Sequence, residues 1–133
     1  MLVLPDNDVP AVVEVLRRVL ESDEWADYCR AIGVEFTTFE DHGLARNAKD
    51  QQVWETCQAV GAVLVTANRA GGVGSLDETI NTLGDAESLP VITVADPQRV
   101  LLDGDYAYQT AIQLLDFLER IDTLRGAGRL FVP

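Results

Sequence analysis

Apolar residues along the chain follow two spacings, and the changes between them predict the secondary structure. Short runs that are almost wholly apolar occur at 1–6 (MLVLPD), 62–66 (AVLVT) and 89–95 (LPVITVA). Runs of this length and composition are typical of strands buried on both faces of a parallel sheet. The alternating segment 34–39 (VEFTTF) and the last segment, 126–133 (GAGRLFVP), predict two further strands.

Between these runs the apolar residues recur at helical spacing. The pattern predicts five helices, over residues 8–22, 22–33, 50–61, 75–84 and 105–124. Residues at several boundaries agree with this assignment. Asp8 is placed to cap the first helix, and Gly33 and Gly61 follow the ends of the second and third. Ser75, with Glu78 three residues later, forms a capping box at the start of the fourth.

Strands and helices alternate along almost the whole chain. This order is typical of a mainly parallel sheet with helices on both faces. We find no internal repeat, low-complexity tract or linker, and 133 residues suffice for one hydrophobic core. The expected fold class is α/β, a three-layer domain with a five-stranded sheet, filling residues 1–133.

The composition is acidic. Twenty-two Asp and Glu residues face ten basic residues, for a formal charge of −12, and Lys49 is the only lysine. Such a surface repels nucleic acid unless the basic residues cluster or a metal ion intervenes. No apolar run approaches the length of a membrane span, and the first residues lack the features of a signal peptide. We therefore expect no membrane association and a cytoplasmic location.

The cysteines, the histidine and the glycine-rich segment do not by themselves indicate a functional site. Cys29 and Cys57 lack the spacing of a zinc site and are expected to be reduced thiols in the core. His42 is the only histidine and falls in a loop, where a catalytic role needs partners that the sequence does not supply. The glycine-rich segment 71–74 lacks the G-K-S/T ending of a phosphate-binding loop.

The candidate chemistry lies where the strands end. Ligands of open parallel sheets bind beyond the carboxyl ends of the strands. Asp6 follows the first predicted strand, Thr66 and Asn68 end the third, and Asp96 follows the fourth. Converging carboxylates repel one another, and a hard cation such as Mg²⁺ or Mn²⁺ relieves that repulsion. A response-regulator receiver domain also gathers acids there, but it needs a lysine after its last strand, and this chain has none.

Two stretches resemble compact bacterial PIN-like nuclease domains. "LPDNDVP" resembles their first strand, which ends L-x-D-x-x-x-P. "HGLARNAKDQQVWETCQAVGAVLVTANR" resembles their middle, where a G-L-x-x-x-x-x-D element precedes a helix and the next strand ends T-x-D-R. The resemblance covers residues 1 to about 70; beyond that, only the order of elements agrees.

The resemblance implies a set of site residues. Asp6 falls on the first metal-binding acid, Asp50 on the second, and Thr66 on the threonine of T-x-D. Asn68 falls on the third acid, where the chain departs from the family pattern, and its amide oxygen is expected to complete the metal ligands weakly. A further acid of the family has no clear counterpart, and Asp77 and Asp96 are the two candidates.

The resemblance also implies an activity: a Mg²⁺- or Mn²⁺-dependent endoribonuclease, related to the toxins of toxin–antitoxin pairs. Arg46, Lys49 and Arg69 flank the expected site and could contact RNA phosphates. An antitoxin protein, or a second copy of the chain in a homodimer, is a further candidate partner. Because an amide at residue 68 removes one negative charge, the alternative is a PIN-like binding module that has lost catalysis.

Overall fold

The computed structural model describes all residues, 1–133, and contains one five-stranded sheet in which every pair of neighbours is parallel. The strand order is β2-β1-β3-β4-β5. The strands are β1 (Leu2–Pro5), β2 (Glu35–Phe36), β3 (Ala62–Thr66), β4 (Val91–Val94) and β5 (Arg129–Val132). β1 and β3 lie side by side at the middle of the sheet, in a register that pairs Pro5 with Val65.

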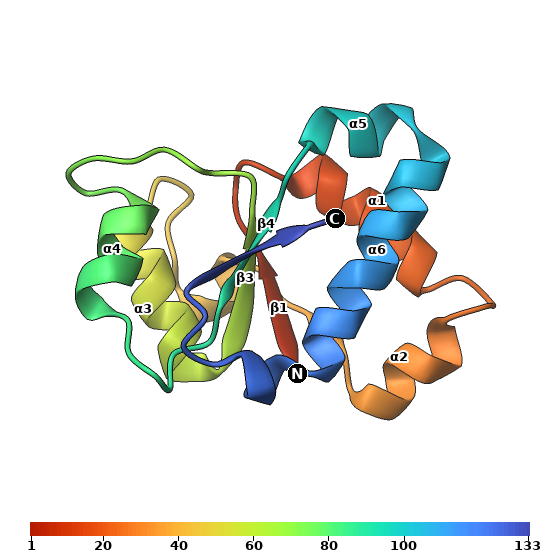
Figure 1. Cartoon of the computed structure of the whole chain (residues 1–133), viewed down its shortest axis with the longest axis horizontal. Helices are drawn as coiled ribbons and strands as arrows, with labels where there is room; N and C mark the ends of the chain where they lie inside the picture. Colours follow the sequence, from red (N-terminus) through yellow and green to blue (C-terminus); the bar gives the residue numbers. More distant parts are fainter.

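Six α-helices cover the two faces of the sheet (Figure 1). They are α1 (Pro10–Leu20), α2 (Ala26–Ile32), α3 (Asp50–Val60), α4 (Leu76–Leu83), α5 (Pro97–Leu102) and α6 (Gly104–Glu119), with short 3-10 helices η1 (Glu40–His42) and η2 (Ile121–Leu124). Helices α3 and α4 cover one face, and α1, α2, α5 and α6 lie on the other. The fold class predicted from the sequence, a three-layer α/β domain with a parallel five-stranded sheet, is confirmed.

Strands β1, β3 and β4 are almost wholly apolar because each has two faces to bury, whereas the edge strands β2 and β5 each begin with a charged residue. Val63 and Val65 of β3 belong to the larger core, under α1 and α6. Ala62 and Leu64, which alternate with them in the sequence, belong to the smaller core, under α3 and α4. The strand period of two thus sends successive residues into different cores, and all five residues of β3 are buried.

Several predicted boundaries are confirmed. Gly33 and Gly61 end α2 and α3 in the left-handed conformation, with φ of 77° and 74°. The Ser75 hydroxyl accepts the Glu78 N–H at 3.1 Å and caps α4. Both cysteines are buried free thiols, as expected, and burial raises the pKa of Cys57 to about 12.

Three local predictions are wrong. Asp8 does not cap α1, whose N-cap position is held by Val9 without any side-chain cap. The second strand contains only Glu35 and Phe36, because the chain beyond them leaves the sheet toward η1. The apolar spacing also did not predict α5, in which Pro97 occupies the first turn, a position that proline favours.

The structure contains no helix with the length and apolar character needed to cross a bilayer.

Candidate functional site

The cleft between β1 and β3 lies where the connections of the sheet diverge. The chain leaves β1 into α1 on one face, and it leaves β3 into α4 on the opposite face (Figure 1). Divergence of this kind opens a crevice at the carboxyl ends of the two strands, the usual place for a ligand in an open parallel sheet. The carboxyl edge of β1 and β3 is therefore the candidate site on topology alone.

A buried threonine hydroxyl joins the ends of the two strands. The ladder of β1 and β3 extends to Asp6, whose N–H donates to the Val65 carbonyl at 2.8 Å. This brings the carboxylate of Asp6 next to Thr66, whose hydroxyl donates to Asp6 Oδ2 at 2.8 Å. The same hydroxyl oxygen accepts the N–H of Asn68 at 3.0 Å. Thr66 is fully buried, so these bonds fix the strand end from inside.

Asp8 is a second carboxylate at the same hydroxyl. Its Oδ1 lies 3.4 Å from Thr66 Oγ1, but a hydroxyl carries one proton and Asp6 holds the shorter contact. The pKa of Asp8 is raised, first by loss of water around it and then by the charge of Asp6. The site therefore holds two carboxylates that compete for one donor, which is a local excess of negative charge.

Asp50 and Asn68 meet on the other side of this cleft. Asp50 is the first residue of α3, and its Oδ2 accepts the side-chain N–H of Asn68 at 3.2 Å. The side-chain oxygen of Asn68 accepts the N–H of Ala70 at 3.0 Å. These two contacts fix which end of the Asn68 amide faces Asp50. If the amide were flipped, its oxygen would face the carboxylate oxygen of Asp50, and the two acceptors would repel each other. The amide of Asn68 thus satisfies Asp50, which an aspartate at this position could not do.

The loop before α3 forms the remaining wall. The side-chain amide of Asn7 donates to the carbonyl of Arg46, which ties this loop to the end of β1. The resulting cleft has a volume of about 310 Å³. Its lining residues are Asp6, Asn7, Asp8, Phe39, Arg46, Ala48, Asp50 and Asn68. The fold therefore brings together in one cleft four of the residues predicted from the sequence: Asp6, Arg46, Asp50 and Asn68.

Asp77 and Asp96, the candidates for a further acid, are not among the cleft residues. Asp77 accepts two hydrogen bonds from Arg129, at 2.6 and 3.1 Å. Asp96 caps α5, where its carboxylate accepts the N–H of Arg99 at 3.1 Å. Both carboxylates thus have partners in the structure that account for them without a ligand.

Arg129 is a site-supporting residue that sequence reasoning missed. Its guanidinium is 11% exposed and pairs with Asp77. It also donates to the Asn68 carbonyl at 2.8 Å and to the Thr93 hydroxyl at 2.7 Å. It therefore ties the end of β3 to β4, β5 and α4. One feature of the sequence could have indicated this role. Arg129 begins a mostly apolar predicted strand, and a buried charged side chain needs a partner.

Three basic side chains have no carboxylate partner, and one of them lines the cleft. Seven of the nine arginines form ion pairs within 4 Å of an acid. The three remaining basic residues are Arg46, Lys49 and Arg69. Arg46 lines the cleft, Lys49 precedes Asp50, and Arg69 follows Asn68. In a chain with more than two acids for every base, the free cationic residues thus include one in the cleft wall and two that are sequence neighbours of cleft residues.

The donor set fits a weakly held divalent cation. No group of three or more Asp, Glu, His or Cys side chains is close enough to enclose a metal ion. Mg²⁺, however, is usually held by one or two carboxylates together with waters and substrate phosphates. Asp6 and Asp8, which share one hydroxyl donor, present oxygens of this kind, with Asp50 across the cleft.

Comparisons of the chain with protein-family models, with curated proteins and with solved structures gave no match.

The raised pKa of Asp8 predicts a pH-dependent effect of Asp8→Asn. Because the folded state disfavours the ionised carboxyl, wild type carries a penalty at neutral pH that disappears below the ordinary pKa of 3.8. We expect Asp8→Asn to raise the melting temperature at pH 7 and to lose this advantage as the pH falls toward 3. Thermal unfolding at a series of pH values measures this. Asp23→Asn, at an exposed acid without an ion pair or hydrogen bond, is the control; a gain for Asp8→Asn that persists at pH 3 would contradict the prediction.

Proposed function

We propose that this chain is a PIN-like domain that cleaves RNA with the help of Mg²⁺ or Mn²⁺, at a site weakened by Asn68. The observation that carries the proposal is the convergence of Asp6, Asp50, Thr66 and Asn68 at one sheet edge, where the resemblance to PIN-like nucleases puts the cation-binding residues. Arg46 in the cleft wall, with Lys49 and Arg69 next to Asp50 and Asn68 in the sequence, supports a substrate with phosphates.

Each residue has a part in this proposal. Asp6 and Asp50 would hold the cation, which supplies an activated water and neutralises charge on the scissile phosphate. Asp8, whose pKa lies above its ordinary value, is suited to accept a proton from the attacking water. Asn68 positions Asp50 through its amide and cannot act as a base. Arg46, Lys49 and Arg69 would hold the flanking phosphates.

A second cavity supports single-stranded RNA as the substrate class. It has a volume of about 300 Å³ and shares Asp6, Asn7, Phe39 and Arg46 with the acidic cleft. Its wall includes Phe36, with the guanidinium of Arg17 5.3 Å from the ring centroid. Aromatic rings and guanidinium planes are the surfaces on which proteins stack unpaired bases. A nucleotide next to the scissile phosphate could place its base here.

One observation favours a second function. The amide of Asn68 satisfies Asp50 without a cation, and its own oxygen is engaged by Ala70. A site stabilised in this way has less need of a metal ion. The alternative proposal is a PIN-like binding module that has lost catalysis and acts through a protein partner, such as an antitoxin or a second copy of the chain.

Cleavage of a fluorescent single-stranded RNA separates the two proposals. We expect slow cleavage with Mn²⁺ or Mg²⁺, none with EDTA, and a loss of at least about a hundredfold for Asp6→Asn, since the cation loses a ligand. Asn68→Asp should cleave faster than wild type, and Asp23→Asn should be unchanged. If neither wild type nor Asn68→Asp cleaves with either ion, the nuclease proposal fails and the binding module remains.

The free cationic residues predict how RNA affinity responds to salt. Arg46→Gln should weaken binding of single-stranded RNA and reduce the slope of log affinity against log salt by about 0.7, the value for one lost contact to a single-strand phosphate. Fluorescence anisotropy measures this, with Ca²⁺ replacing Mg²⁺ to prevent cleavage. The matched control is Arg30→Gln, because Arg30 pairs with Asp27 on α2, away from the cleft. Equal slopes for Arg46→Gln and Arg30→Gln would contradict a phosphate contact by Arg46.

A further inference from the structure

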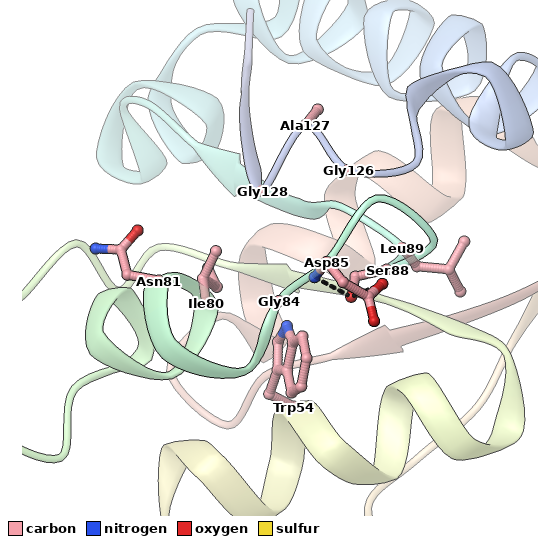
Figure 2. A pocket seen from close by; sticks show the side chains of 10 residues that line it. All are labelled: Trp54, Ile80, Asn81, Gly84, Asp85, Ser88, Leu89, Gly126, Ala127 and Gly128. Atoms are coloured by element: carbon pink, nitrogen blue, oxygen red, sulfur yellow. Dashed lines mark hydrogen bonds between the residues drawn. The ribbon is translucent and has the colours of Figure 1, made fainter.

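A second candidate binding site lies at the opposite edge of the sheet. Its cavity has a volume of about 340 Å³ and lies where the chain enters β4 and β5, beside the end of α4 (Figure 2). Residues from α3, α4 and the segments before these strands line it, among them Trp54, Ile80, Asp85, Ser88 and Gly128. None of its lining residues belongs to the acidic cleft.

Trp54 presents an unused hydrogen-bond donor to this cavity. The residue is only 6% exposed, yet its indole N–H donates to no acceptor in the protein. No fully enclosed side-chain nitrogen or oxygen lacks a partner, so the indole nitrogen has some access to solvent, and Trp54 is one of the residues that line the cavity. Figure 2 shows that nitrogen on the side of the ring nearest Gly84. The indole of Trp25, by contrast, donates to the Tyr108 hydroxyl at 3.1 Å.

Asp85 supplies a free acceptor at the same cavity. Its Oδ1 accepts the N–H of Glu87 at 2.8 Å and the hydroxyl of Ser88 at 3.3 Å, which holds the carboxylate in place. Its Oδ2 accepts no hydrogen bond from the protein, and no basic side chain pairs with it. The cavity therefore offers a fixed acceptor together with the donor of Trp54.

Two glycines leave part of the backbone wall of the cavity without side chains. A Cβ on Gly84 would lie 2.4 Å from the Ile80 carbonyl oxygen, so only glycine fits there. Gly128 has φ of +78°, which disfavours any side chain, and its N–H has no acceptor in the protein. The Gly128 N–H is thus a further unpaired donor among the residues that line the cavity.

These features select a flat, uncharged ring that carries both an acceptor and a donor. Trp54 provides an aromatic wall and an N–H, and Asp85 provides the acceptor. The carboxylate and the overall charge of −12 oppose a phosphate, and the volume suits a ring with one sugar. We propose that this cavity binds the base of a nucleoside, in a site separate from the acidic cleft. The proposal does not depend on RNA cleavage.

Nuclear magnetic resonance of the two indole N–H groups tests the proposal directly. The Trp25→Phe variant assigns the two signals. We expect adenosine, guanosine, cytidine or uridine to shift the Trp54 signal saturably and to leave the Trp25 signal unmoved. The 5′-monophosphate of the same nucleoside should bind more weakly, because the protein carries a net charge of −12 and no basic residue lines this cavity.

Asp85→Asn, which replaces the free acceptor oxygen, should weaken nucleoside binding about tenfold, as expected for a lost hydrogen bond to a charged group. Asp23→Asn is the control and should bind as wild type does. A specific site would be occupied by a nucleoside at about 10 mM. If the Trp54 signal does not move with any of the four nucleosides at that concentration, the proposal is overturned. Binding that is unaffected by Asp85→Asn overturns it equally.

Discussion

The parallel pairing of β1 with β3 is the constraint on which the candidate site depends. Their shared register carries the backbone ladder one residue past β1, to Asp6, and so sets its carboxylate against the buried hydroxyl of Thr66. That hydroxyl also fixes the backbone of Asn68, and Asn68 reaches Asp50 on α3. A one-residue shift in this register would turn the side chains of the strand to the opposite face and separate all four groups.

Charge at this edge is balanced by local contacts. Asp6 and Asp8 compete for the proton of Thr66, whereas Asp50 has an amide in Asn68 and Asp77 has a guanidinium in Arg129. Negative charge is thus relieved at Asp50 and Asp77 but left in excess at Asp6 and Asp8. This unequal balance leaves the excess charge where the proposed cation site needs it.

Hydrophobic spacing alone was enough to predict the fold, because strands buried on both faces and amphipathic helices have distinct periods. It also placed Asp6, Thr66 and Asn68 at strand ends. The assignment of Asp50 to the site depended on the resemblance to PIN-like nucleases. An acid at the first position of a helix usually only interacts with the helix dipole. The sequence did not indicate which acid pairs with Arg129, because Asp77 lies 52 residues away and only tertiary packing brings them together. The free N–H of Trp54 could not be inferred for the same reason.

Calorimetric titration of Mn²⁺ into wild type, Asp50→Asn and Asn68→Asp tests the cation site most directly. If the cleft is a weakened metal site, wild type binds one ion weakly, Asp50→Asn binds none, and Asn68→Asp binds about tenfold more tightly, because a third carboxylate joins the ligands. If wild type and Asn68→Asp bind no Mn²⁺, or if all three proteins bind it equally, the acids at the ends of β1 and β3 and at the start of α3 do not form a cation site.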